Sequence, residues 1–345
     1  MAMSGTNDKT HTLIIIRHNR DLLDAMEVPK KLNHESDNDA VNVQNLLEPP
    51  NVPTTTTSTA TTSIRIEANA RLDEQQLLKL VYLYSTSLIS FQLQIDSAIS
   101  RRFLVPFLSQ VTSCASNLKT LCLQTNNCFP LSIDHLEALA PAMMNPTSPP
   151  LERLCLPLGT DPRAETCPLK TIGLILANPY SKLKVLSLEI FSWEHLSHDE
   201  FLDPLLPALS TNETLETLDV RVRPDIVHVE GRVPAYLTIK GMVQLADLLE
   251  NHNCTLQQVG FIAFPSPRLY GLPNDPLVQV LQNSITMYLL LNRAGRKRLL
   301  KELDDHTAKQ DMEWIMAVAQ VNENVPAIYY LLSRNLSLMI GGVSR

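Results

Sequence analysis

Two cysteines occupy the same place in two consecutive copies of a short leucine pattern, Cys122 in "LKTLCL" and Cys155 in "LERLCL". If each copy is a strand and the strands are parallel neighbours, the backbones run ~4.8 Å apart and the thiols lie close together. Adjacent thiols can form a redox pair or bind a soft metal ion. No other cysteine or histidine falls in the pattern, so we favour a simpler interpretation, two small side chains on neighbouring strands.

The segment "WEHLSHDE" at 193–200 places His195 and His198 beside acidic residues. Imidazole and carboxylate groups together are ligands for divalent metals. Ser197 and Glu200 have the spacing of a helix capping box, which puts His195 before the helix. We therefore interpret the segment as a solvated loop and expect no bound metal.

The segment "TLIIIRHNRD" at 12–21 is a short apolar run followed by Arg17 and His18. It resembles the start of the histidine phosphatases, in which an arginine and a histidine bind and attack a phosphoryl group. Here Asn19 replaces the glycine of that motif, and the family needs a full α/β domain behind it. We interpret the segment as a chance match in a flexible N-terminal arm.

The segment "NRAGRKRLLK" at 292–301 carries five basic residues in ten. Such a cluster is typical of a nuclear-localisation signal or a phosphate-contacting patch. The acidic "ELDDH" follows directly, so we favour a solvated helix with charges of both signs.

The motifs that the sequence lacks, together with its composition, exclude several classes of function. The sequence lacks glycine-rich phosphate loops, the nucleophile elbow, zinc-protease motifs and EF-hand loops, so we expect a protein that is not an enzyme and uses no cofactor. A net charge of −7 and 5% aromatic residues argue against nucleic-acid binding. No apolar run approaches the ~18 residues of a membrane span, and Leu13 to Ile16 are too few for a signal peptide. We expect a cytoplasmic monomer with reduced thiols, with nuclear entry left open, and unused sequons at Asn212, Asn253 and Asn335.

The leucine pattern L-x-x-L-x-L recurs along most of the chain. Clear copies begin at 88, 118, 151, 183 and 215, and a weaker copy begins at 256. Partial copies are "IRI" at 64–66 and "LLLN" at 289–292. The steps between the clear copies are 30, 33, 32 and 32 residues. This near-constant spacing predicts a repeat architecture, in which each unit buries its apolar face against the next.

Amphipathic helical patterns lie between the copies. Examples are "LSIDHLEALAPAMM" and "TIKGMVQLADLLE", the second of which opens with Thr238 as a cap. Each unit therefore reads as strand, loop, helix and turn. This order predicts an α/β fold with parallel strands on one side and helices on the other.

This organisation resembles the leucine-rich repeat, specifically the ribonuclease-inhibitor-like class with a full helix on the convex side. The resemblance covers roughly 60 to 340 and implies a horseshoe-shaped solenoid with its strands on the concave face. The residues that carry it are Leu118, Leu121, Leu123, Asn126, Leu183, Leu186, Leu188, Leu215 and Leu218. The asparagine that follows the strand in this family is present at Asn126 and Asn292.

The C-terminal part resembles the ending of uncharacterised leucine-rich-repeat proteins of diatoms. The residues that carry this likeness are Asn292, Arg293, Gly295, Arg296, Trp314 and Tyr329. It reads as a last strand plus helices that cover the open end of the solenoid. We therefore predict a mostly disordered Thr- and Pro-bearing arm over 1–62, a solenoid of seven to eight units over 63–292, and a helical cap over 293–345.

The binding residues are predicted from the alternation of side chains along a strand. The positions between the leucines face away from the core, and the candidates among them are Gln124, Arg153, Glu189, Asp219 and Arg221. Two insertions, 221–237 and 264–276, add the candidates Arg232, Tyr236 and Arg268. The alternatives are an ordinary solvated sheet and tolerated surface loops.

These observations predict a non-enzymatic scaffold that binds a protein partner through the concave strand face or the 221–276 loops. One alternative is a regulator of a small GTPase, because some ribonuclease-inhibitor-like proteins activate such enzymes. A sensor module of innate-immunity type is ranked last, since it needs a nucleotide-binding domain that the sequence lacks.

Overall fold

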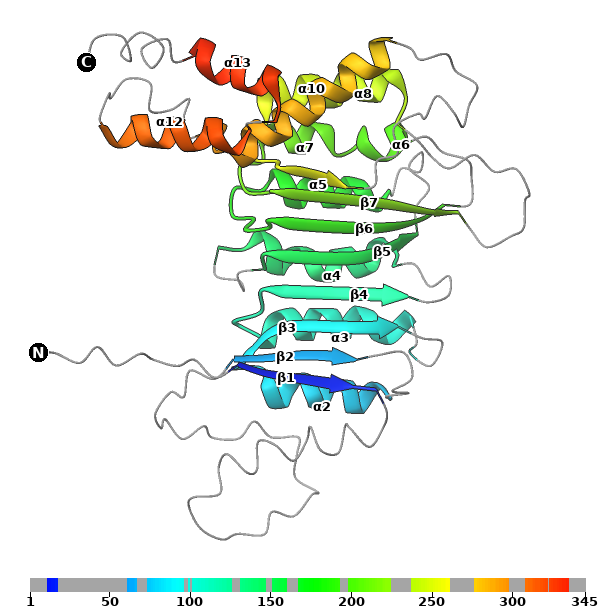
Figure 1. Ribbon diagram of the computed structural model, residues 1–345. Helices are drawn as coiled ribbons and strands as arrows, with labels where there is room; N and C mark the ends of the chain where they lie inside the picture. The colour runs from blue at the N-terminus through cyan, green and yellow to red at the C-terminus, as the bar shows by residue number, and fades with distance from the viewer. Residues whose placement is uncertain are drawn as a thin grey trace, which may run out of the picture.

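The computed structural model presents the chain as a stack of strand and helix units (Figure 1). The residues that the structure describes are 11–17, 61–66, 73–95, 99, 101–125, 131–146, 151–159, 167–192, 198–224, 237–260, 276–297, 308–321 and 323–334.

The strands form one open, all-parallel sheet whose spatial order follows the sequence, from β1 to β8. Their bounds are β1 (His11–Ile16), β2 (Thr61–Ile66), β3 (Leu88–Ile95), β4 (Thr120–Thr125), β5 (Arg153–Gly159), β6 (Val185–Ser192), β7 (Thr217–Pro224) and β8 (Gln258–Gly260). Every neighbouring pair is parallel, as the repeat pattern predicts.

The leucines of the pattern line up in register across the sheet and form its core. One row of paired positions is Ile14, Ile64, Phe91, Leu121, Leu154, Leu186, Leu218 and Val259. All of them except Val259 are buried, and Phe91, Leu121, Leu154, Leu186 and Leu218 are 0% exposed. The inward positions of one unit thus pack directly on those of the next, which is the arrangement that makes a repeat stack cohere.

The helices lie on the other side of the strands in Figure 1 and connect them in turn. Their bounds are α2 (Glu74–Tyr84), α3 (Arg101–Cys114), α4 (Ile133–Met144), α5 (Pro168–Ala177), α6 (His198–Leu202), α7 (Leu206–Thr211) and α8 (Ile239–Asp247), followed by a π-helical turn η3 (Leu248–His252). Successive helices contact one another along the stack, for example α3 with α4 and α4 with α5. One face of the sheet is therefore covered by helices; we call the opposite face the open face.

Local sequence explains where several helices begin. Asp73 caps α2 by accepting from the Gln76 amide at 2.8 Å, and the Gln76 side chain accepts from the Asp73 amide at 3.0 Å. Thr238 caps α8 as predicted, since its hydroxyl accepts from the Gly241 amide at 3.4 Å. Asp199 of α6 in turn accepts from the Thr238 amide at 2.8 Å and contacts the Thr238 hydroxyl. The start of α8 is thus tied to the preceding unit.

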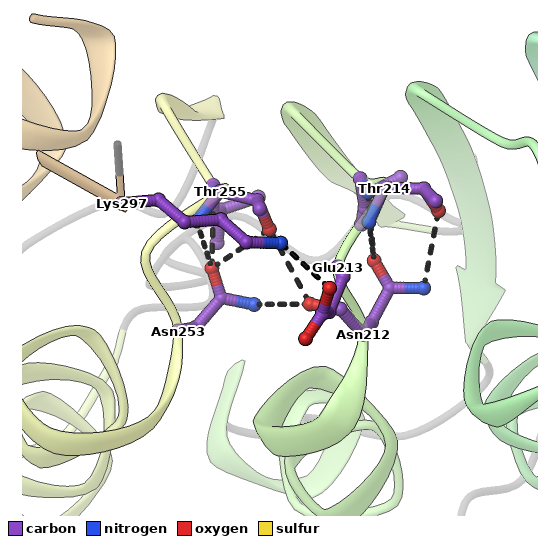
Figure 2. A network of polar contacts seen from close by, with 8 residues as sticks. Asn212, Glu213, Thr214, Asn253, Thr255 and Lys297 are labelled. Carbon is purple, nitrogen blue, oxygen red and sulfur yellow. Dashed lines mark hydrogen bonds and ion pairs between the residues drawn. The ribbon is translucent and has the colours of Figure 1, made fainter. Parts of the chain in front are cut away.

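Buried asparagines form hydrogen bonds that stabilise the turns leading from helix to strand (Figure 2). Asn212 accepts from the amides of Thr214 and Leu215 at 3.0 and 2.7 Å and donates to the Leu176 carbonyl at 2.7 Å. Asn253 repeats this one unit later, accepting from the amides of Thr255 and Leu256 and donating to the carbonyls of Leu209 and Asn212. Each asparagine shapes its own turn and also bonds the preceding unit.

This series corrects one expectation of the sequence analysis. The sequence predicts that Asn292 follows a strand, "LLLN" at 289–292, but the segment is helical and lies in α10 (Pro276–Arg293). Asn292 is buried and donates to the carbonyls of Asn253 and Leu256 at 3.1 and 2.8 Å. It therefore continues the helix-end series of Asn212 and Asn253. Asn126 lies outside the described residues.

The C-terminal helices α10, α12 (Ala308–Gln320) and α13 (Val325–Arg334) lie beside the β8 end of the stack (Figure 1). Helix α10 contacts α8, η3 and α13, and α12 contacts α13. The strand predicted at 289–292 is therefore wrong, because this segment belongs to α10.

Arg296 is a charged residue that is only 1% exposed, and its contacts hold the cap against the end of the stack. Its Nη2 donates to the Leu249 carbonyl, to the Asn253 carbonyl at 3.1 Å and to Cys254 Sγ at 3.2 Å. Its guanidinium also lies 5.1 Å from the centre of the Tyr288 ring, within the range of a cation–π contact. A basic residue of the 292–301 cluster is thus part of the interior of the cap.

At the other end, the sheet begins earlier than predicted. We expected order to start near 63, but His11–Ile16 forms β1 and pairs with β2 from His11↔Thr61 to Ile16↔Ile66. The apolar run that resembles the histidine phosphatases is therefore a strand of the sheet. Residues 18–60 lie outside the described part of the chain.

Within the described ranges, no helix has both the length and the apolarity needed to cross a membrane.

Candidate functional site

The candidate site is the open face, where side chains from successive strands form rows. The central row, in register order, is Ile15, Arg65, Gln92, Cys122, Cys155, Ser187, Asp219 and Gly260. One flanking row includes Thr120, Arg153, Val185 and Thr217. The other includes the pairs Gln94↔Gln124, Pro157↔Glu189 and Glu189↔Arg221.

Five of the predicted binding residues share this face. Gln124, Arg153 and Arg221 are exposed, whereas Glu189 and Asp219 are partly buried. The structure thus brings together Gln124, Arg153, Glu189, Asp219 and Arg221 through strand register alone. Arg232, Tyr236 and Arg268 lie outside the described residues, as does His195.

Asp219 is the centre of a small polar cluster at one end of the face. Its Oδ2 accepts from the Ser187 hydroxyl at 3.3 Å and lies 3.3 Å from Arg221 Nε. A Cβ on the neighbouring Gly260 would lie 3.0 Å from Asp219 Oδ1, closer than such contacts usually allow. Gly260 therefore leaves room for the carboxylate, and the cluster fixes the position of Arg221 at the edge of the face.

Cys122 and Cys155 meet in the middle of the face. They are register partners on β4 and β5, and both are partly buried. Contact between the two thiols raises the pKa of Cys122 and lowers the pKa of Cys155 below its ordinary 9.0. Arg153 and Arg221 also lower the pKa of Cys155, while burial and Asp219 raise it. The structure confirms that the two thiols are neighbours.

A charged row that sequence reasoning missed lies just before the strands. Glu152 bonds Lys184 on one side and Lys119 on the other, with Nζ–Oε distances of 3.2 and 3.3 Å. The Lys184 ammonium, followed by that of Lys119, lowers the pKa of Glu152, although burial acts in the opposite sense. Lys119, Glu152, Lys184 and Glu216 hold the same position in successive copies, so the alternation of charge was readable from the aligned repeat.

The groups on this face do not form a metal centre. Across the described part of the chain, no group of three or more histidine, cysteine, aspartate or glutamate side chains is placed to hold an ion. The chemistry of the face is that of mixed charges, amides and two adjacent thiols.

No family model matches this sequence, and a search of curated proteins found no match either.

Proposed function

We propose that this chain is a leucine-rich-repeat protein of the ribonuclease-inhibitor-like class that acts as a non-enzymatic scaffold for a protein partner. Support for the class comes from leucine rows in parallel register and from a helix between most consecutive strands. Because fold alone does not define function, the functional part of the proposal rests on the open face.

The observation that carries the proposal is the arrangement of side chains on that face. Its central row is short over three strands, with Cys122, Cys155 and Ser187, and longer polar side chains flank it, including Gln124, Arg153 and Glu189. In Figure 1 none of the described helices crosses β3 to β6 on this side. A partner that approaches the short central row would have charged and amide groups within reach on both flanks.

Mixed charge on the face favours a partner with mixed charge rather than a polyanion. Arg153 and Arg221 supply positive charge, whereas Glu189 and Asp219 supply negative charge on the same face. Complementary charges of this kind select partners and orientations more than they add affinity. A protein surface with both acidic and basic groups fits this face better than a nucleic acid does.

The proposal that the chain is not an enzyme rests on the sequence, in which no catalytic motif is found. The alternative role as a small-GTPase regulator stays a prediction.

The experiment compares two charge-changed variants in affinity capture from native lysate. The open-face variant carries Gln124→Lys and Arg153→Glu, and its matched control carries Lys79→Glu and Arg102→Glu, which change exposed residues of α2 and α3 on the helical side. Both must retain the circular dichroism and melting temperature of the wild type. We expect the control to keep the partners of the wild type and the open-face variant to lose them.

If the open-face variant keeps every partner, the open face is not the binding surface. The same preparation, assayed with a panel of small GTPases, then tests the alternative: faster GTP hydrolysis would contradict the assignment as a passive scaffold.

A further inference from the structure

The two thiols at the centre of the open face are placed for reaction with each other. Cys122 and Cys155 are direct register partners on adjacent parallel strands. Neighbouring strands lie ~4.8 Å apart, which is within the ~4.4–6.8 Å that separates the Cα atoms of disulfide-bonded cysteines. Both side chains are partly exposed, so a small reagent has access to them.

The surroundings of the pair distinguish its two members. Arg153 precedes Cys155 by two residues on β5 and therefore lies on the same face. Contact between the thiols lowers the pKa of Cys155 and raises the pKa of Cys122, and Arg153 lowers the pKa of both. A nearby guanidinium group favours the thiolate, which is the nucleophilic form of cysteine. Asp219, which opposes this effect, is itself bonded to Arg221. Cys155 is thus the nucleophile and Cys122 its proton-bearing neighbour.

The other described cysteines lack this arrangement. Cys167 is buried, Cys114 contacts the Ser113 hydroxyl at 3.9 Å, and Cys254 contacts Arg296 Nη2 at 3.2 Å. Cys254 is a useful comparison, because it is partly exposed and lies beside an arginine but has no described thiol as a strand partner.

We propose that Cys122 and Cys155 form a reversible redox pair, in which Cys155 reacts with a hydroperoxide and Cys122 resolves the product into a disulfide between β4 and β5. A zinc site is the weaker interpretation, because structural zinc takes four ligands and the described residues offer no third ligand at this place.

The chemistry balances in two steps. The Cys155 thiolate attacks one peroxide oxygen; an S–O bond forms, the O–O bond breaks, and the alkoxide leaves as the alcohol after it takes a proton. The Cys122 sulfur, after losing its proton, then attacks the Cys155 sulfur. The S–S bond forms, the S–O bond breaks, and hydroxide leaves as water. Two thiols and one hydroperoxide thus give one disulfide, one alcohol and one water, and a dithiol or thiol reductant reverses the oxidation.

Formation of this bond would change the middle of the open face. It would remove the reactive thiol beside Arg153 and add a covalent link between two strands that are otherwise joined by the hydrogen bonds of the sheet and by the connection through α4. The proposal is independent of the proposed scaffold function, since the disulfide is measured on the purified chain without a partner.

The test treats the reduced 345-residue chain with hydrogen peroxide, blocks the remaining thiols with N-ethylmaleimide and identifies linked peptides by mass spectrometry. We expect a Cys122–Cys155 link that dithiothreitol reverses. In the Cys122→Ser variant we expect Cys155 to accumulate as sulfenic acid that dimedone traps. In the Cys155→Ser variant we expect oxidation of Cys122 to slow on the order of tenfold.

Two further variants keep the test decisive. Cys128 lies outside the described residues, so the experiment is repeated in a Cys128→Ser background, where the same link is expected. Arg153→Met is expected to slow oxidation of Cys155, and Arg153→Lys to restore most of the rate. The proposal is overturned if Cys254 or Cys114 oxidises before Cys155, or if Cys155 passes to sulfinic acid in the wild type without forming the link.

Discussion

At the scale of single residues, the buried asparagines of the helix-end turns make the most specific hydrogen bonds between units. Asn253 is 1% exposed and bonds to two backbone amides in its own turn and to two carbonyls of the preceding unit. Its replacement leaves buried backbone groups without partners, which costs more than the bonds themselves contribute.

We expect Asn253→Ala to lower the free energy of unfolding by about 3 kcal/mol, measured by urea denaturation, because several buried groups lose their partners at once. Asn251→Ala is the matched control, since Asn251 is exposed and its amide donates only to Asp247 Oδ1. A change of the same size in both variants would contradict the role given to the buried series.

The ion pairs of Glu152 predict a pH dependence. Because Lys184 and Lys119 lower its pKa from the ordinary 4.5, Glu152 stabilises the fold above that value. This contribution is lost as the pH falls through the lower pKa of the folded state.

We therefore expect Glu152→Gln to lose about 0.5 kcal/mol of stability near neutral pH, a small value because the pairs are exposed to solvent. The difference from the wild type should disappear in acid, below the pKa of the folded state. Urea unfolding at both conditions measures it, and a difference that persists in acid would show that the charge of Glu152 is not the cause.

The asparagine series also shows what could be read from the sequence. "NETL" and "NCTL" precede two strands at the same offset, and this recurrence was available. The two segments read as polar turns that lead to the next strand and as unused sequons, but nothing in the letters indicates that the asparagine side chains are buried and bond the preceding unit. In the folded chain both side-chain amides donate to buried carbonyls of the preceding unit, so neither is available to carry a glycan.

At the scale of elements, the start of α8 is the junction most sensitive to size. Gly241 packs against Asp199 and Leu237, and an added Cβ would lie 2.6 Å from Leu237 Cδ1. The added Cβ would also clash with the Asp199 carboxylate, which accepts from the Thr238 amide. The substitution would therefore disturb both the N-cap of α8 and the contact between α6 and α8.

Gly241→Ala should therefore cost about 1–3 kcal/mol, although alanine is the better helix former. Val243→Ala in the same helix changes an exposed side chain and should stay within about 0.5 kcal/mol. Thermal melting of both variants tests this, and a stabilised Gly241→Ala would show that the junction has more room than the structure indicates.

Element boundaries were predicted well where the repeat was complete and poorly where it was partial. The pattern around Leu118, Leu183 and Leu215 predicted strands that the register confirms. "LLLN" at 289–292 contains three leucines but no alternation, so periodicity could not separate a strand from a buried helix. Leu13 to Ile16 lacks the full pattern, and a long polar segment separates it from the next strand, so nothing local indicated that it joins the sheet.

At the scale of the whole molecule, the cap and the stack depend on each other. Arg296 and Asn292 reach from the α10 end of the chain to backbone carbonyls of the last turn, and Lys297 Nζ lies 2.7 Å from Glu213 Oε2 of an earlier turn (Figure 2). End units protect the apolar interior of a repeat stack.

We expect Arg296→Leu to cost about 2–3 kcal/mol and to broaden the unfolding transition, because the last units lose their anchor. Arg293→Leu, which changes an exposed residue of α10, should leave the transition nearly unchanged. A sharp, unshifted transition in Arg296→Leu would mean that the cap does not stabilise the units below it.

The open face as a whole follows from the repeat, which is why five of its candidate residues could be assigned from the sequence. The pairing of Asp219 with Ser187 and Arg221 could not be assigned, since it depends on side-chain conformations across strands. The identity of a partner is not encoded in these short-range patterns.

Whether the open face is the binding surface is tested most directly by a footprint of the chain bound to a captured partner. Phenylglyoxal modification of arginines is compared with and without the partner, with Arg153 and Arg221 as reporters of the open face and Arg102 as the reporter of the helical side. We predict that the partner protects Arg153 and Arg221 and leaves Arg102 reactive. Protection of Arg102 with Arg153 and Arg221 unchanged would contradict the open face as the binding surface.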